Sequence, residues 1–259
     1  MRTYLLIFLL LALNACKTNS EKEQQNLSET ATTPIENHPQ TLQKILNAHG
    51  GLDNWNRYQT LSFTIPGEVS EKHSIDLNSR KDKVERGNAT LGFDGTTVWL
   101  HDPENSYKGN PDFYHNLMFY FYAMPFVLAD PGIIYEETEA LEVNDTIYPG
   151  LKISFKPQTG ASSNDEYYLY YNPESYRMRW LGYTATFGAA EKSNQVNYIA
   201  YDNWSSVEDI LLPESITWYG SEEGKITEAR RTVNFEARSL DKQAKPDEFY
   251  QKPAVQSEN

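Results

Sequence analysis

The residue whose type and position most directly imply chemistry is the single cysteine of the chain, Cys16. It follows an apolar run over residues 4–13 and then Asn14 and Ala15. A thiol after a small residue, with Leu13 three positions earlier, matches the site at which lipoprotein signal peptidase cleaves, although Asn14 is a less usual residue there. We expect Cys16 to carry the lipid, including a palmitate-type acyl chain. An ordinary signal peptide with an incidental cysteine is the alternative, but a lone thiol fits an oxidising compartment poorly.

The residues on either side of Cys16 support export. The apolar run is shorter than the ~20 residues of a membrane-spanning helix and follows Arg2, as in a secretory signal peptide. Residues 1–16 are therefore predicted to be a lipoprotein signal peptide. Residues 17–37 are rich in Glu, Gln, Asn, Ser and Thr, which predicts a disordered tether. Because Lys17 rather than Asp follows the cysteine, we expect a lipid anchor in the cell envelope, in the outer membrane.

Other residues capable of chemistry do not form a recognisable catalytic pattern. The five histidines are too far apart in sequence to form a local zinc pair. Glu136, Glu137 and Glu139 cluster, but charges at strand edges are usually solvated, and nothing pairs them as in a glycosidase. Nucleophile-elbow, phosphate-loop and dinucleotide-binding motifs are missing from the sequence. The prediction is a protein that is not an enzyme, with no catalytic residue, metal site or cofactor.

The charge of the chain restricts its partners. The formal net charge is −13, and no cluster of Lys and Arg interrupts the acidity. Nucleic acid is excluded as an expected partner because phosphate binding needs concentrated basic side chains. Contact with the membrane is instead expected through the N-terminal lipid anchor.

Hydrophobic patterns predict one mainly β domain over residues 38–245, followed by a flexible C-terminal tail, 246–259. An amphipathic helix is expected over residues 41–49, ended by Gly50 and Gly51, and a helical turn over 52–58. Alternating patterns between turn signals then indicate a meandering antiparallel sheet that curls into a barrel or half-barrel. The expected strands are 61–65, 75–77, 84–92, 97–101, 133–143, 151–156, 166–171, 177–184, 195–204, 210–219 and 226–237.

The segment 113–128 differs from these strands. It is rich in aromatic and aliphatic residues that do not alternate, and we interpret it as one or two short helices interrupted by Pro125. A segment this apolar must be buried. It is either a hydrophobic plug over a lipid-binding cavity or an ordinary core helix that closes a sheet.

Several short motifs resemble those of LolA/LolB-like outer-membrane lipoprotein-sorting proteins, and more closely an uncharacterised lipoprotein family of Bacteroidota. The phrase Asp94-Gly95, then Trp99, then Asp102-Pro103 is the most specific of them. The resemblance implies an open antiparallel half-barrel of about eleven strands, with short helices over its concave face and an apolar cavity for acyl chains. It carries no catalytic residue. The chain departs from the soluble carrier of that group in having its own anchor, which argues against a shuttle. The other motifs are Ala48-His49-Gly50-Gly51 with Trp55, Tyr171-Asn172-Pro173 with Met178-Arg179-Trp180, and Leu212-Pro213-Glu214.

The sequence therefore favours an anchored envelope protein whose half-barrel binds an acyl chain or a lipoprotein lipid. The alternative is a non-enzymatic interaction or structural lipoprotein whose barrel is filled with side chains. The residues expected to line the hydrophobic cavity are Phe119, Phe121, Tyr122, Met124, Phe126, Trp99 and Trp180.

Overall fold

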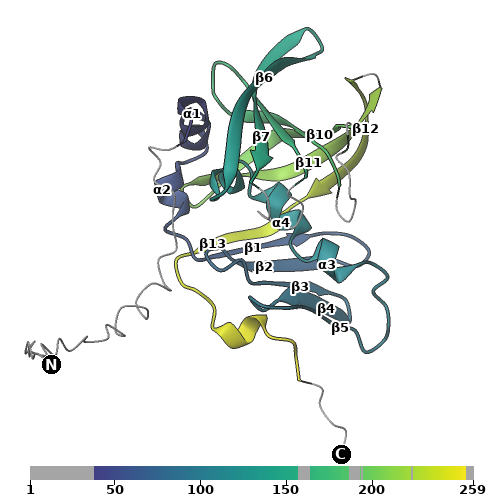
Figure 1. Ribbon diagram of the computed structural model, residues 1–259. Helices are drawn as coiled ribbons and strands as arrows, with labels where there is room; N and C mark the ends of the chain where they lie inside the picture. Colours follow the sequence, from purple (N-terminus) through teal and green to yellow (C-terminus); the bar gives the residue numbers. More distant parts are fainter. Residues whose placement is uncertain (1–37, 157–163, 187–192, 194, 223, 255–259) are drawn as a thin grey trace, which may run out of the picture. The chain divides into compact units, whose positions relative to one another are not determined.

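The computed structural model describes residues 38–156, 164–186, 193, 195–222 and 224–254 (Figure 1). The expected signal peptide, Cys16 and the tether lie outside these residues. The helices are α1 (Gln40–Ala48), α2 (Leu52–Trp55), α3 (Pro111–Tyr114) and α4 (Leu117–Tyr122), with 3-10 helices η2 (Phe126–Ala129) and η3 (Asp247–Tyr250). The strands are β1 (Thr60–Ile65), β2 (Glu71–Asp76), β3 (Asp82–Arg86), β4 (Ala89–Phe93), β5 (Val98–His101), β6 (Ile133–Val143), β7 (Thr146–Phe155), β8 (Tyr167–Tyr171), β9 (Met178–Tyr183), β10 (Asn197–Val207), β11 (Ile210–Glu222), β12 (Lys225–Asn234) and β13 (Glu236–Asp241).

The strands form two antiparallel sheets, and one continuous stretch of chain contributes a strand to each of them. Sheet A has the order β13-β1-β2-β3-β4-β5, and sheet B the order β12-β11-β10-β9-β8-β7-β6. β12 and β13 are separated only by Phe235, whose N–H donates to the carbonyl of Glu214 on β11 at 2.8 Å. Across the described residues, β5 and β6 end this order without pairing to each other. The prediction of a mainly β, open antiparallel half-barrel is confirmed.

The structure has more strands than the sequence predicted. The stretch 84–92, expected as one strand, is a hairpin of β3 and β4 because Gly87 adopts a φ of 57° and turns the chain. The stretch 226–237 is likewise divided at Phe235 into β12 and β13.

The predicted first helix is present as α1, and a buried histidine joins it to sheet B. His49 follows α1 and is fully buried. Its Nδ1 contacts the carbonyl of Ile45 at 2.8 Å, and its Nε2 lies 3.4 Å from the backbone N–H of Met178 on β9. Nδ1 therefore carries the proton, and Nε2 accepts. Burial lowers the pKa of His49 to about 4, so the ring is neutral at physiological pH.

Figure 1 shows α4 between the two sheets. α3, α4 and η2 occupy the segment predicted as short helices, and Pro125 separates α4 from η2 as expected. The core cluster contains side chains of α4 and η2 together with Phe63 on β1 and Leu169 on β8. The segment is thus buried between sheet A and sheet B.

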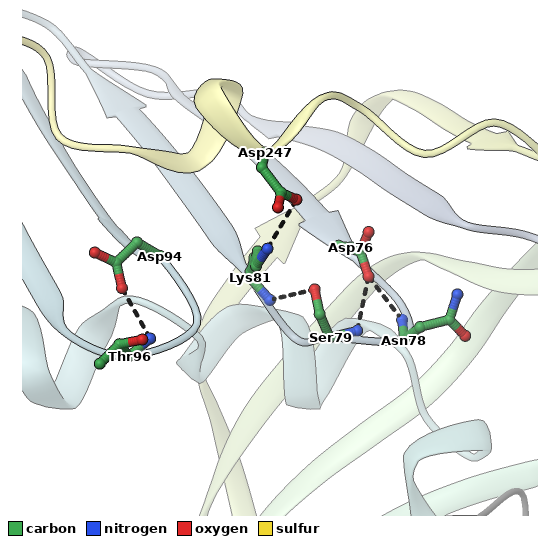
Figure 2. A network of polar contacts seen from close by, with 7 residues as sticks. All are labelled: Asp76, Asn78, Ser79, Lys81, Asp94, Thr96 and Asp247. Carbon is green, nitrogen blue, oxygen red and sulfur yellow. Dashed lines mark hydrogen bonds and ion pairs between the residues drawn. The ribbon is translucent and has the colours of Figure 1, made fainter. Parts of the chain in front are cut away.

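The C-terminal boundary lies beyond the predicted one. Residues 246–250 were expected in a flexible tail, but Asp247–Tyr250 forms η3, and Tyr250 is buried. The indole N–H of Trp99 donates to the carbonyl of Tyr250 at 2.9 Å, and Lys81 Nζ lies 2.8 Å from Asp247 Oδ1 (Figure 2). The buried ring of Tyr250, the hydrogen bond from Trp99 and the ion pair with Lys81 together hold this short segment on sheet A.

Two turns of sheet A are held by side chains that accept from the backbone (Figure 2). Asp76 Oδ1 accepts from the backbone N–H of Asn78 and of Ser79, and Asp94 Oδ1 accepts from that of Thr96. Short acidic side chains stabilise turns in this way.

Candidate functional site

Five of the seven predicted cavity residues come together in the core between the sheets. Phe119, Phe121, Tyr122, Met124 and Phe126 are all buried and belong to one cluster. They are brought there by α4, the turn at Pro125 and η2. These five residues are thus brought together in the core, and a ligand cavity lined by them stays a prediction.

Aromatic rings pack closely around these side chains. Phe126 stacks on Trp55 of α2, with ring centroids 4.7 Å apart and an interplanar angle of 6°. Tyr122 lies 4.4 Å from Phe63 of β1 and also 4.4 Å from Phe235. These contacts tie the segment to α2, to sheet A and to the strand that joins the sheets.

The remaining two predicted residues lie elsewhere. Trp99 pairs across the strands with Gly92, and this row is on the face of sheet A opposite to the row that contains Phe63. Trp180 is on the face of sheet B opposite to Leu169, in a separate cluster with Tyr170 and Tyr198. The prediction grouped both with the central cavity because aromatic type alone does not reveal which face a strand residue occupies.

Tyrosine rings cover two glycines on that second face of sheet B. A Cβ at Gly150 would lie 2.6 Å from Tyr170 Cδ1, and a Cβ at Gly182 would lie 3.3 Å from Tyr168 Cβ. The glycines therefore leave room for aromatic side chains to lie across the strands. The aromatic residues of these strands therefore pack against one another on this face.

Two polar contacts fasten α3 to the inner face of sheet A. The hydroxyl of Tyr114 donates to Glu71 Oε2 on β2, and Arg86 Nε on β3 donates to Glu71 Oε1 at 3.0 Å. His115 Nδ1 lies 2.6 Å from Asp82 Oδ2 on β3. At the other end of the segment, Arg80 and Asp130 form an ion pair at 2.6 Å, which fixes the chain after η2.

The carboxylates of this network are perturbed in opposite directions. Burial alone would raise the pKa of Glu71, but hydrogen bonds from His73, Tyr114 and Arg86 outweigh it and lower the pKa to about 2. Burial raises the pKa of Asp82, and the contact with His115 opposes the rise. Glu71 is therefore a stable carboxylate, whereas the charge on Asp82 is destabilised by its surroundings.

A surface pocket of about 560 Å³ lies where β10 meets β13. Val207, Phe235 and Ala237 supply its apolar lining, and Arg238 lies among its polar residues. Phe235 also packs on Tyr122, so the lining of the pocket is in contact with the buried apolar segment. Sequence reasoning missed this pocket because its residues come from strands that are distant in the chain.

The other candidate groups show no common centre. Within the described ranges, no group of three or more His, Cys, Asp or Glu side chains is arranged to hold a metal ion. Glu136, Glu137 and Glu139 are exposed or half-exposed along β6. No helix in the described part of the chain has the length and apolarity needed to span a membrane.

Three solved structures are similar to this chain in fold. A DUF1329 family protein from Desulfovibrio piger shares 10% identity and a TM-score of 0.48, covering 82% of this chain and 95% of that one. A LolA superfamily protein from Nitrosomonas europaea shares 10% identity and a TM-score of 0.42, covering 81% and 97%. A putative outer membrane lipoprotein-sorting protein domain from Vibrio parahaemolyticus shares 9% identity and a TM-score of 0.44, covering 83% and 97%. The group named from the sequence motifs is thus represented among the structural neighbours.

A family model described as a family of unknown function (DUF6503) matches residues 105–233. The matched region runs from before α3 to the last residue but one of β12, and so covers β6 to β11 and nearly all of β12. No curated protein matches the sequence.

Proposed function

We propose that this protein is an exported envelope lipoprotein, anchored through Cys16, that binds a hydrophobic ligand between its two sheets. The ligand is an acyl chain or the lipid of a lipoprotein, and the role is binding without catalysis. The observation that carries the proposal is the apolar segment α4–η2 inside an open sheet, in contact with a surface pocket through Phe235.

The location in the envelope is supported by the sequence alone. The run before Cys16 and the polar stretch after it are those of a lipid-anchored, exported protein. The resemblance to lipoprotein-sorting proteins agrees with an outer-membrane location.

Ligand entry requires the segment to move, because its rings fill the space around it. The polar contacts of Tyr114, His115 and Asp130 hold its two ends, and α4 itself is six residues long. The hydroxyl of Tyr201 donates to the carbonyl of Phe121 in α4 at 2.8 Å, so this hydrogen bond must break or follow the helix when the segment moves. A helix this short is not stable in isolation, so α4 depends on its packing against the rest of the protein. A bound acyl chain would form apolar contacts in place of the ring contacts that are lost when the segment moves.

The test combines native mass spectrometry of the purified chain with titration of a fluorescent fatty acid. We expect co-purified lipid and saturable binding by the wild-type protein. Phe119→Glu should remain folded by circular dichroism and lose affinity, because the carboxylate reaches the water of an accessible site. Phe113→Glu is the matched control, since Phe113 is 41% exposed in the same segment and should bind as wild type.

A second function has its own supporting observation. The stacked and tilted rings around Phe126 and Tyr122 favour a filled core, which would make the protein an envelope interaction or structural module. In that case Phe119→Glu would place an unpaired carboxylate among apolar atoms and unfold the domain. Wild-type protein without co-purified lipid or probe binding, together with an unfolded Phe119→Glu variant, would establish this alternative.

A further inference from the structure

Arg238 places a guanidinium at the boundary between the pocket and the core. It lies on β13 next to the pocket residue Phe235, and its side chain is 17% exposed. Nη2 lies 3.3 Å from Glu214 Oε1 on β11, whereas Nη1 is buried without a hydrogen-bond partner in the described structure. One half of the guanidinium is therefore paired, and the other half has no acceptor.

Tyr122 supplies a second buried donor beside it. Its side chain is fully buried, its ring packs on Phe235, and its hydroxyl has no hydrogen-bond partner among the described residues. The guanidinium of Arg238 lies close enough to counteract the rise in the pKa of Tyr122 that burial causes. A guanidinium can only donate, so it cannot accept the phenolic proton.

The phenolic oxygen can accept from the guanidinium, so the buried donor left without an acceptor is the phenolic proton, which carries the cost of its lost hydration. A carboxylate has two oxygens that accept from both groups at once, and its geometry suits the fork of an arginine. The pocket also contains the exposed carboxylates Glu208 and Glu236, and Glu214 contacts the same arginine. This acidic rim repels a multiply charged anion more strongly than a singly charged one, which favours a carboxylate over a phosphate.

The apolar lining indicates what the carboxylate is attached to. Val207 and Phe235 are buried, and with Ala237 they form a hydrocarbon surface beside Arg238. We propose that this pocket binds the carboxylate of an amphiphilic acid through Arg238 and Tyr122, with the first carbons of its chain against Val207 and Phe235. The proposal rests on the proposed function and specifies the chemical class of its ligand: a free fatty acid rather than a neutral acyl ester.

The test compares lauric acid with its methyl ester on the purified full chain, by displacement of a neutral fluorescent lipid probe. The wild-type chain should bind the acid at least about tenfold more tightly than the ester, as expected for hydrogen bonds to a charged acceptor. Tyr122→Phe removes only the hydroxyl and should weaken binding of the acid about fivefold to tenfold without changing binding of the ester. In the absence of ligand, Tyr122→Phe should stay folded, because the ring that packs on Phe235 is unchanged.

Tyr168→Phe is the matched control. Tyr168 lies on the other face of sheet B, and its hydroxyl donates to Glu166 at 2.9 Å. It should bind acid and ester as the wild type does. Equal affinity of the wild type for acid and ester, or an unchanged preference in Tyr122→Phe, would refute the carboxylate site while leaving hydrophobic binding in place. Failure of both ligands to bind would refute the proposed function together with this inference.

Discussion

Replacement of Glu71 by glutamine tests whether the polar network under α3 stabilises the fold through a charged carboxylate. In the folded protein the pKa of Glu71 is lowered from its ordinary 4.5 to about 2, and its side chain is only 14% exposed. One pKa unit corresponds to about 1.4 kcal/mol, so the charged form contributes at most about 3.5 kcal/mol at pH 7.

The sign of the pH dependence follows from the lowered pKa. Below pH 4.5 the unfolded chain takes up a proton at this position before the folded protein does, so stability is lost as the pH falls from 4.5 towards 2. At pH 3 about 1.5 kcal/mol of the contribution should remain. The variant lacks this titration. The difference in unfolding free energy between wild type and Glu71→Gln should therefore shrink by about 2 kcal/mol between pH 7 and pH 3.

Urea unfolding followed by tryptophan fluorescence measures these free energies. Glu85→Gln on β3 is the matched control, because Glu85 is 40% exposed and forms exposed ion pairs with Lys72 and Lys83. Its effect should stay below about 1 kcal/mol at both pH values. A Glu71→Gln variant as stable as wild type at pH 7, or a difference that does not change with pH, would refute the reasoning.

Three further predictions concern the anchor and the packing. Cys16→Ser should remain an uncleaved precursor without radiolabelled palmitate, and labelling equal to that of the wild type would exclude lipidation at this residue. Phe126→Ala removes the stack on Trp55 and should cost about 3–5 kcal/mol in urea unfolding, whereas a loss below about 1 kcal/mol would show that the ring does not support the core. Gly150→Ala should lower stability by about 1–3 kcal/mol, because the new Cβ would lie 2.6 Å from Tyr170 Cδ1. Gly67→Ala is the control. The nearest atom to its new Cβ would lie at 3.6 Å, so its stability in urea unfolding should be nearly that of the wild type. Equal effects at the two glycines would contradict the steric argument.

Local patterns in the sequence were sufficient for the elements themselves. The amphipathic stripe of α1 and the turn at Gly50 predicted the first helix, and β6 begins and ends where its alternation predicted. Pro125 also correctly indicated an interrupted helical segment. These features depend on neighbouring residues, which the sequence displays directly.

The parts that sequence reasoning missed depend on pairing between distant strands. Tyr114 and Glu71 are 43 residues apart, and His115 and Asp82 are 33 apart, so only the packing of α3 on sheet A brings each pair together. The face on which Trp99 lies also depends on register, since a shift of one residue reverses it. The period-two alternation of β2 does place Glu71 and His73 on the inner face, and this was the one available signal for the buried polar network.

The pairing of β1 with β13, which begins directly after Phe235, determines when sheet A can be completed during folding. β1 pairs with β13, and the hydroxyl of Thr60 donates to the carbonyl of Gln243, 183 residues later. If the chain is exported as proposed, it leaves the translocation channel with its N-terminus first, and β1 stays without its later neighbour until nearly all of the protein has crossed. Contacts of such large sequence separation slow folding and leave apolar strands unprotected in the meantime. Holding factors in the compartment that receives the chain would consequently have the most time to act on β1, before β13 covers its free edge.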